Sequence, residues 1–290
     1  MTKKFFFLTV LLLSACTVLF TACGDDDSEN DNSTEQTDPD TGSSNGDDTG
    51  GNNQSDGTTF KGPQRVFGQN RLKAFGRVDY DRYELTYDDR GFVTKVRRTK
   101  DYEDKVYETT YSYEGNTVTM TQYKNGSLRG TGVGTIGSNG YLESGVGPEN
   151  EPLTFTYNND EQLVSISVKE KNETETLTFN WQGGNIILSA WNGGHATSIT
   201  YSSLANVGCV MEYDDGMNID MDDWNLFYYL GLIGKGTSLL PSEWAYRGSS
   251  YTEQGTNEWV LDNQGRAVKL ISTQAENGGR SETKEFFWEW

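Results

Sequence analysis

Histidine and cysteine are scarce in this chain of 290 residues, and each shortage excludes a class of site. His195 is the sole histidine, and nothing resembles the G-x-S-x-G turn of a serine hydrolase, so we expect His195 to lie exposed in a turn. Only Cys209 remains as a thiol beyond residue 59, which excludes an intramolecular disulfide there and predicts a small buried side chain. One histidine and one thiol cannot form a zinc site without carboxylates.

Apolar residues are absent from residues 24–59, which hold 11 acidic side chains and no lysine or arginine. Such a segment cannot bury enough surface to offset the entropy of ordering, so we expect an unfolded acidic tether. A flexible coil of this length spans about 33 Å, and self-repulsion extends it.

Basic residues are the minority in residues 60–290, where 22 lysines and arginines stand against 32 acidic residues. This balance argues against nucleic acid as a partner, because phosphates need a basic footprint. It also argues against electrostatic adhesion to anionic lipid.

The N-terminus carries the pattern of an export signal. Two lysines precede an apolar run over residues 5–13, and two small residues precede Cys23. We interpret residues 1–22 as a lipoprotein signal peptide, and residues 23–59 as a lipidated Cys23 followed by the tether. The longer apolar run over residues 5–20 is slightly short of the roughly 20 residues that a bilayer core needs, and residues 14–17 interrupt it, which argues against a retained transmembrane helix.

Cys23 has a competitor as the lipidated residue. The segment resembles a bacterial lipoprotein signal, and Cys16 follows a better local match to it, residues 13–15. Cleavage at Cys16 would leave an apolar stub, whereas cleavage at Cys23 leaves a polar start, so we favour Cys23. The acidic triplet of residues 25–27 resembles export signals of Bacteroidota lipoproteins, and it also begins the tether. We therefore expect a lipid anchor in the outer membrane, facing the cell exterior.

One phrase recurs along the rest of the chain, and it predicts strand, turn, strand. Leu85 and Tyr87 are followed by Asp88, Gly91 and Val93. Residues two apart share a face of a strand, and an aspartate with a glycine permits a tight turn. The phrase recurs from Phe155, with one residue more before its second strand, and from Trp259, with shorter versions from Tyr111 and Phe179.

These hairpins predict one all-β domain over residues 60–290. We expect roughly twelve to fourteen strands between Tyr80 and Trp290. They would form a long antiparallel meander curled into an open or closed barrel-like sheet, because a long meander must limit its exposed edges. Residues 222–234 break the pattern with a nearly continuous apolar run, which predicts a short helix that is buried in or plugs the sheet.

The phrase Y-x-Y-D-x-x-G resembles the YD repeats of Rhs-type shell proteins. The order of signal, acidic linker, YD-like hairpins and late apolar helix is similar to an uncharacterised Bacteroidota lipoprotein family with a porin-like β fold. The resemblance covers about residues 78–290 of the folded part and implies that fold and an outer-membrane address. It implies no catalytic residue.

Insertion of the strands themselves into a membrane is not what the sequence favours. The aromatic end of the chain, residues 286–290, resembles the assembly signal of outer-membrane barrels. The strands nevertheless lack the apolar lipid-facing band of roughly 9–11 residues that a spanning strand needs.

Candidate ligand-binding residues are Trp191 and Trp244, which lie near expected turns and can stack on sugar rings. Asp214, Asp220 and Asp222 offer oxygen ligands suited to calcium; the alternative is an acidic turn in which Asp222 or Asp223 caps the helix. Paired carboxylates can support glycoside hydrolysis, but among 32 acids some pair qualifies by chance.

We therefore expect a non-enzymatic surface lipoprotein that binds a glycan or another envelope protein and uses no cofactor. Two alternatives stay open: a structural envelope component, and a carboxylate-based glycan-processing enzyme. An enzyme is expected to show convergent carboxylates with a perturbed pKa, and a glycan binder exposed aromatic side chains.

Overall fold

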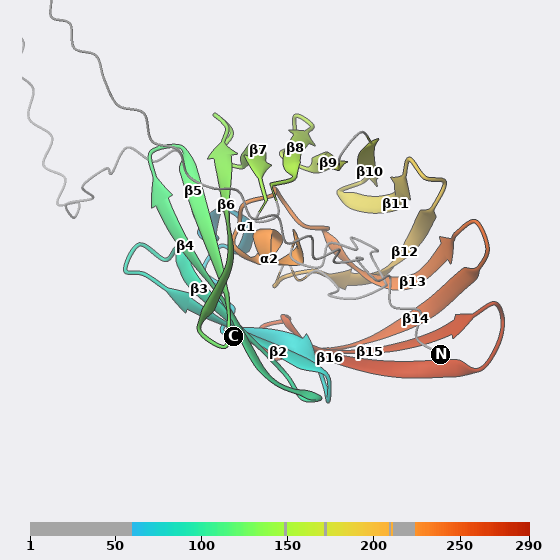
Figure 1. Ribbon diagram of the computed structural model, residues 1–290. Coiled ribbons are helices and arrows are strands. Elements are labelled where there is room, and N and C mark those ends of the chain that lie inside the picture. The colour runs from blue at the N-terminus through green and yellow to red at the C-terminus, as the bar shows by residue number, and fades with distance from the viewer. Residues whose placement is uncertain (1–59, 148–149, 171–172, 209, 211–223) are drawn as a thin grey trace, which may run out of the picture. The chain divides into compact units, whose positions relative to one another are not determined.

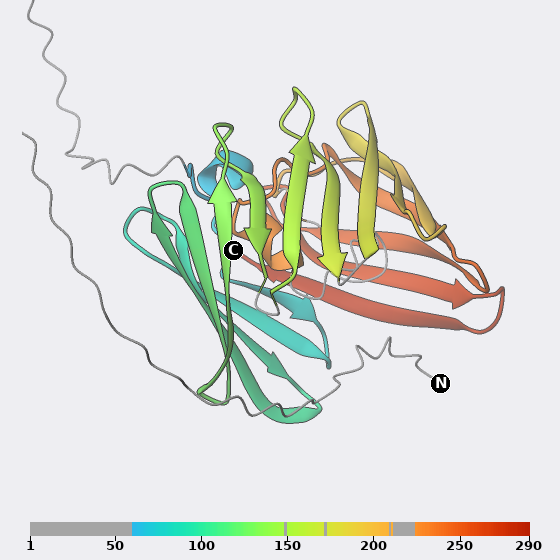
Figure 2. The same cartoon turned by 45° about the horizontal axis from the view of Figure 1, so that its top comes forward.

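The strands close into one antiparallel barrel (Figure 1). The computed structural model describes residues 60–147, 150–170, 173–208, 210 and 224–290. Within them sixteen strands form a meander in which each strand pairs with its neighbours in sequence, and β1 pairs with β16. Figure 2 shows the green and yellow strands side by side with alternating directions. The predicted all-β meander is confirmed, and the sheet is closed.

The strands are β1 (Ala74–Arg77), β2 (Asp81–Tyr87), β3 (Val93–Lys100), β4 (Glu103–Glu114), β5 (Thr117–Lys124), β6 (Ser127–Ile136), β7 (Leu142–Val146), β8 (Pro152–Tyr157), β9 (Leu163–Glu170), β10 (Glu173–Gln182), β11 (Asn185–Trp191), β12 (Ala196–Ala205), β13 (Leu239–Arg247), β14 (Thr252–Leu261), β15 (Ala267–Glu276) and β16 (Ser281–Glu289).

The described residues hold more strands than the twelve to fourteen expected. β1 lies before the expected start of the sheet, and β6 lacks the aliphatic alternation that marks other strands. Two inner positions of β6 are Gly132 and Gly134. A Cβ on Gly134 would lie 2.5 Å from the Leu142 side chain on β7, so close packing of these strands requires glycine.

Three hairpins built on the recurring phrase share one register. The residue before the turn pairs with the residue six positions later, and a bulge follows: Tyr87 with Val93, Tyr157 with Leu163, and Leu261 with Ala267. The extra residue expected in the second hairpin is therefore absent. Glu161 occupies its glycine position, with a φ of 65° against 84° for Gly91 and 79° for Gly265.

Glu161 is held in this left-handed conformation by its surroundings. Its carboxylate accepts a hydrogen bond from Arg65 and lies 3.2 Å from Lys235 Nζ. A non-glycine residue in this region is strained by about 1–3 kcal/mol, and such contacts can offset that cost. The departure from the phrase therefore ties this hairpin to two other segments.

Aromatic tips of the repeats hold the strand ends in register. Seven residues share one arrangement, in which a tyrosine hydroxyl or tryptophan N–H donates to a main-chain carbonyl of another segment. We call these seven residues the aromatic girdle: Tyr87 to Leu72 (2.6 Å), Tyr113 to Val93 (2.9 Å), Tyr157 to Leu142 (2.7 Å), Trp181 to Leu163 (2.8 Å), Tyr201 to Ile186 (2.8 Å), Trp259 to Pro241 (2.7 Å) and Trp290 to Ala267 (2.9 Å). Each ring packs inside while its polar atom is satisfied.

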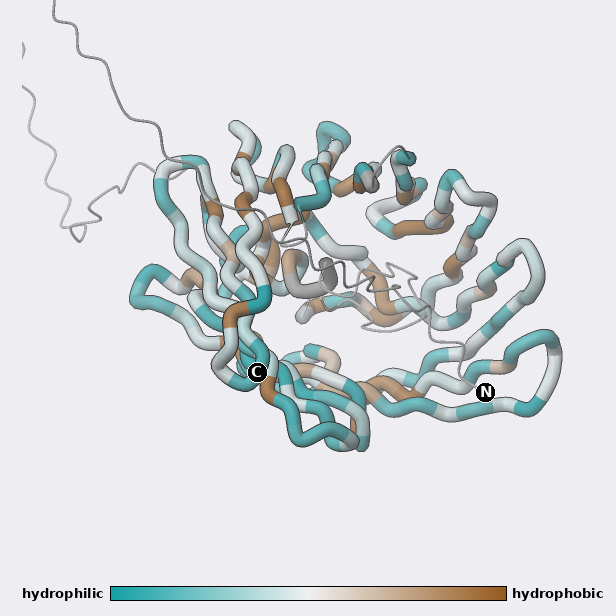
Figure 3. The backbone as a smooth tube through the Cα atoms, in the orientation of Figure 1, coloured by the Kyte–Doolittle hydropathy of each residue, from teal (hydrophilic) through white to brown (hydrophobic). Residues whose placement is uncertain are grey.

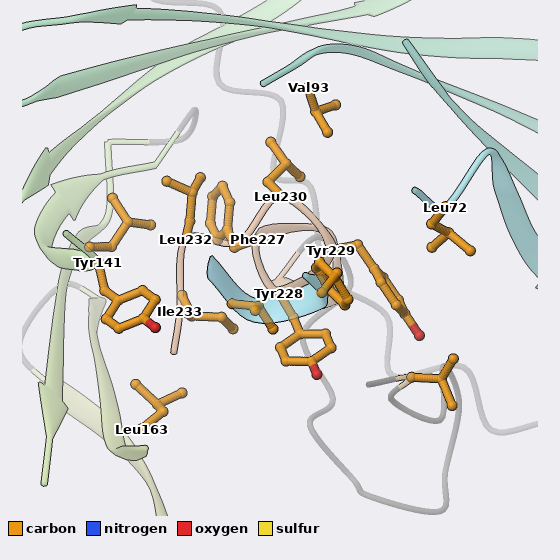
Figure 4. Packing of buried hydrophobic residues seen from close by; sticks show 14 of the residues in the cluster. Leu72, Val93, Tyr141, Leu163, Phe227, Tyr228, Tyr229, Leu230, Leu232 and Ile233 are labelled. Atoms are coloured by element: carbon orange, nitrogen blue, oxygen red, sulfur yellow. The ribbon is translucent and has the colours of Figure 1, made fainter. Parts of the chain in front are cut away.

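Two short helices pack at the girdle end of the barrel. α2 (Trp224–Tyr229) falls within the predicted 222–234 helix, and its chain continues as a buried apolar turn through Leu230 and Leu232 (Figure 4). The predicted buried helix is confirmed but shorter, because Gly231 adopts a φ of 75° and ends it. α1 (Gln64–Phe67) was not predicted, since four residues give no periodicity. No helix in the described ranges has the length and apolarity to cross a membrane.

Candidate functional site

The outer face of the barrel is polar. Outward positions alternate with buried ones along the strands and are mostly hydroxyl-bearing or charged, as at Thr86, Lys95 and Glu108. Hydroxyl pairs link neighbouring strands, such as Thr156 and Ser165, whose oxygens lie 2.5 Å apart. A membrane-spanning barrel has the reverse pattern, apolar outside and polar inside. This exterior supports the expectation that the strands do not span a membrane.

The inner face changes from apolar to polar along the strands. On β16, Trp288 and Phe286 are buried near the girdle, Lys284 follows, and the side chain of Glu282 is 63% exposed. On β2, β3 and β5 the inner positions run in the same order, from aliphatic or aromatic to charged or amide side chains. Figure 3 shows the hydrophilic colour along much of the β15–β16 hairpin at this second end. Solvent therefore reaches the inner face there.

We call this set of inner residues the polar inner wall: Arg77, Asp81, Arg98, Lys100, Tyr107, Gln122, Lys124, Trp191, Thr197, Trp244, Tyr246, Glu253, Gln274, Glu282 and Lys284. One side of it, on β1–β5 and β16, is charged. The other side, on β11–β15, is aromatic and hydroxyl- or amide-bearing.

Asp81 forms a buried ion pair on the charged side of the polar inner wall. Its side chain is buried, and Oδ2 accepts hydrogen bonds from Arg98 Nη2 at 2.7 Å and Nε at 3.2 Å. The Arg98 guanidinium also lies over the Tyr83 ring, 4.8 Å from its centroid. A buried carboxylate is tolerated only with such a partner, so this ion pair is a neutralised scaffold rather than a reactive acid.

Aromatic rings gather on the other side, and we call Trp191, His195, Tyr246 and Tyr251 the aromatic rim. His195 Nδ1 lies 2.6 Å from the Tyr246 hydroxyl, and the Tyr246 and Tyr251 rings are 4.9 Å apart. Trp191 is half-buried on the inner face of β11 and donates its main-chain N–H to the His195 carbonyl. The rim therefore combines ring faces with polar atoms.

Polar groups for hydrogen bonding lie beside the rim. Gln274 Nε2 donates to Glu253 Oε1 at 2.8 Å. Two buried atoms, Thr197 Oγ1 and Trp244 Nε1, have no hydrogen-bond partner within the described part of the chain. A buried polar atom left unpaired costs about 1–3 kcal/mol. Both atoms are enclosed in the core, so this cost is borne inside the protein and the two atoms do not face solvent.

The structure places the two candidate tryptophans differently. Trp191 is half-buried in the aromatic rim, whereas Trp244 is 3% exposed and packs against Gly255. A Cβ on Gly255 would lie 2.5 Å from Trp244 Nε1, so glycine makes room for the indole. The expectation that Trp244 forms part of an exposed platform is therefore wrong, because on β13 the side chain at this position faces the core. The expectation of an exposed His195 is also wrong, since it is half-buried against Tyr246.

Other candidate residues lie outside the described residues. These are the lipidation candidates Cys16 and Cys23, the thiol Cys209, and the calcium candidates Asp214, Asp220 and Asp222. Among the residues that are described, no three histidine, cysteine or acidic side chains group as metal ligands.

Sequence reasoning missed most of the polar inner wall. Lys100 and Lys124 sit in strands that look like ordinary polar-outside strands, and only the pairing shows that they share a face with Tyr107. The available signal was the change from aliphatic to charged residues along one face of a single strand, as from Val96 to Arg98 and Lys100.

Solved structures resemble this barrel at the level of the fold. A porin-like protein from Bacteroides uniformis ATCC 8492 matches with a TM-score of 0.60 and 15% identity, over 80% of this chain and 99% of that one. A porin-like protein from Bacteroides vulgatus ATCC 8482 matches with a TM-score of 0.47 and 15% identity, over 76% of this chain and 99% of that one. No family model and no curated protein matches the sequence. The implied porin-like fold is confirmed; the lipoprotein family and the YD-repeat relation stay predictions.

Proposed function

We propose that this protein is a lipoprotein held on the outer membrane by a lipid on Cys23, and that its barrel is a non-enzymatic glycan-binding module facing the exterior. The observation that carries the proposal is the aromatic rim on an inner wall that solvent reaches. Ring faces provide apolar contact for a sugar, while amide, carboxylate and hydroxyl groups orient it. Gln274 and Glu253 supply amide and carboxylate groups beside the rim.

The pKa shifts of the acidic side chains favour binding over hydrolysis. A glycosidase needs a carboxylic acid whose pKa is raised so that it can donate a proton. The pKa of the carboxyl group is lowered at Glu84, Glu103, Asp262 and Glu289, the opposite of what a general acid needs. The hydrogen bond from Arg82 is the main cause at Glu84 and Glu289.

A glycan array probed with the full-length protein in detergent tests the binding. We expect at least one glycan to bind, and Trp191→Ala to weaken it about tenfold, the value of a lost aromatic contact. Tyr123→Ala removes a ring from the outer face of β5 and is the matched control. Binding to no glycan would contradict the proposal, and release of shortened sugars during incubation would favour the enzyme instead.

The anchor is tested by cell fractionation. Cys23→Ser is expected to move the protein from the membrane pellet to the soluble fraction, because the acidic chain has no electrostatic hold on anionic lipid. Cys16→Ser is the control and should stay in the pellet. The opposite pair of results would assign the lipid to Cys16.

A further inference from the structure

Two lysines of the polar inner wall converge on one tyrosine ring. Lys100 Nζ lies 5.5 Å and Lys124 Nζ 5.1 Å from the centroid of Tyr107. Tyr107 pairs directly with Lys124 on β5 and with Arg98 on β3, and Lys100 follows Arg98 two positions later. Directly paired residues and residues two apart share a face, so these side chains all lie on the inner face.

These two ammonium groups differ from their cationic neighbours in making no ion pair within 4.0 Å. The Glu103 carboxylate lies at the same ring, where it accepts a hydrogen bond from the Tyr107 hydroxyl at 3.4 Å. Its ion pair is with Lys105, which lowers its pKa most, and Lys100 contributes to that lowering from a longer distance. Arg98 is bound to Asp81, Arg77 to Glu282 at 3.4 Å, and Lys105 to Glu103 at 2.9 Å. Among the described residues, no carboxylate oxygen lies within 4.0 Å of Lys100 Nζ or Lys124 Nζ.

The absence of a partner matters because acids are plentiful. Residues 60–290 hold 32 acidic against 22 basic side chains. Two like charges gathered at one ring repel each other, and a bound anion would turn that repulsion into attraction. The cation–π contacts with Tyr107 hold both ammonium groups near the place where such an anion would sit.

An exposed pair of rings lies beside the lysines. Tyr102, at the β3–β4 turn, is 49% exposed, and its ring centroid lies 5.5 Å from Lys100 Nζ. The Tyr80 ring packs 4.9 Å from it. A peptide carboxylate would need only the charges, whereas a sugar ring also needs an aromatic face. The combination of both features favours an anionic sugar.

We propose that Lys100, Lys124, Tyr107 and Tyr102 form a binding site for an anionic sugar unit, one that carries a carboxylate or a sulfate. The two lysines bind the anion, and the exposed face of Tyr102 supports the ring. This inference rests on the proposed glycan binding and names its substrate class, an acidic polysaccharide. The aromatic rim on β11–β14 would then hold uncharged units.

Calorimetric titration of the full-length protein in detergent tests the site with three probes. They are an oligosaccharide of galacturonic acid, a neutral galactose oligosaccharide of equal length, and a polyglutamate peptide of equal charge. We expect the acidic sugar to bind more tightly than either other probe. The double variant Lys100→Gln with Lys124→Gln should weaken acidic-sugar binding at least about tenfold, because charge-assisted contacts are lost. It should leave neutral-sugar binding unchanged.

The matched control removes two charges from the outer face. Lys95→Gln with Lys269→Gln also removes two positive charges, so the net charge changes equally. Both lysines lie on the outer face, where they pair with Glu108 and Glu285. We expect less than about a twofold effect from it, because screened distant charges contribute little. Lys100→Arg with Lys124→Arg keeps both charges and should retain binding. Wild-type binding should also weaken as salt is raised, a measurement that needs no variant.

Each contrary outcome has a distinct meaning. Equal losses in the inner and outer variants, or binding insensitive to salt, would overturn the site. Equal affinity for polyglutamate would overturn the sugar assignment. Binding of the neutral sugar alone would refute this inference and leave the proposed function standing, whereas binding of no sugar would refute both.

Discussion

Replacing Tyr157 by phenylalanine removes one hydroxyl from the aromatic girdle and leaves the ring in place. The hydroxyl donates to the Leu142 carbonyl at 2.7 Å, and the ring stacks on Tyr141 with centroids 5.4 Å apart. The stacking survives the change, so the cost is the lost hydrogen bond and the carbonyl left unpaired. We expect destabilisation by about 1–2 kcal/mol. In a domain of this size the melting temperature should fall by about 2–8 °C.

Thermal unfolding followed by circular dichroism measures the effect. Tyr123→Phe is the control, because this outward tyrosine on β5 makes no hydrogen bond through its hydroxyl to the described residues. The control should have the same melting temperature as the wild type. If Tyr157→Phe has the same melting temperature as the wild type, or if both variants lose the same stability, then the girdle does not hold the strand ends and the reasoning fails.

Three further predictions concern the closure and filling of the barrel. Burial raises the pKa of the Tyr113 hydroxyl, so its contribution to stability is present below the unfolded pKa of about 10 and is lost as pH rises above it. Tyr113→Phe should therefore reduce the fall in the free energy of unfolding between about pH 9 and 11. An unchanged pH dependence would contradict this. The hydrogen bond from Arg82 lowers the pKa of Glu289 across the β2–β1–β16 closure, so Arg82→Gln should cost less than about 1 kcal/mol at neutral pH and lose its effect as pH falls below about 4; urea unfolding at several pH values measures it, and a cost independent of pH would refute the ion pair. Leu230→Ala should cost about 2–5 kcal/mol because Leu230 is fully buried beside α2, while Leu128→Ala at an exposed position should cost little, and equal losses in urea would show that the helix does not fill the barrel.

The local elements could be predicted from the sequence because they depend on nearest neighbours. Tyr87, Asp88 and Gly91 set a turn whose hydrogen bonds join residues within one hairpin, and the structure confirms it. The short buried helix was predictable because its apolar run has no polar face. The positive φ of Glu161 was not predictable, because this conformation depends on Arg65 and Lys235, which lie far away in the chain.

The candidate site was less predictable because it depends on register between strands. Trp191 and Trp244 look alike in the sequence, yet one lies half-buried in the aromatic rim and the other is buried in the core. Their difference arises from Gly255 on the next strand, which gives the Trp244 indole its space. Lys100 and Lys124 meet at Tyr107 because three strands pair in one register, which no single strand encodes.

The sequence by itself determined the meander, its turns and its buried helix, since alternation and turn chemistry act over a few residues. Scarcity of histidine and cysteine likewise excluded whole classes of site before any fold was known. Only the tertiary structure decided that the sheet closes, that its outside is polar and that its inside passes from apolar to charged. Those properties arise when β1 meets β16 and side chains from distant strands come to share one enclosed face.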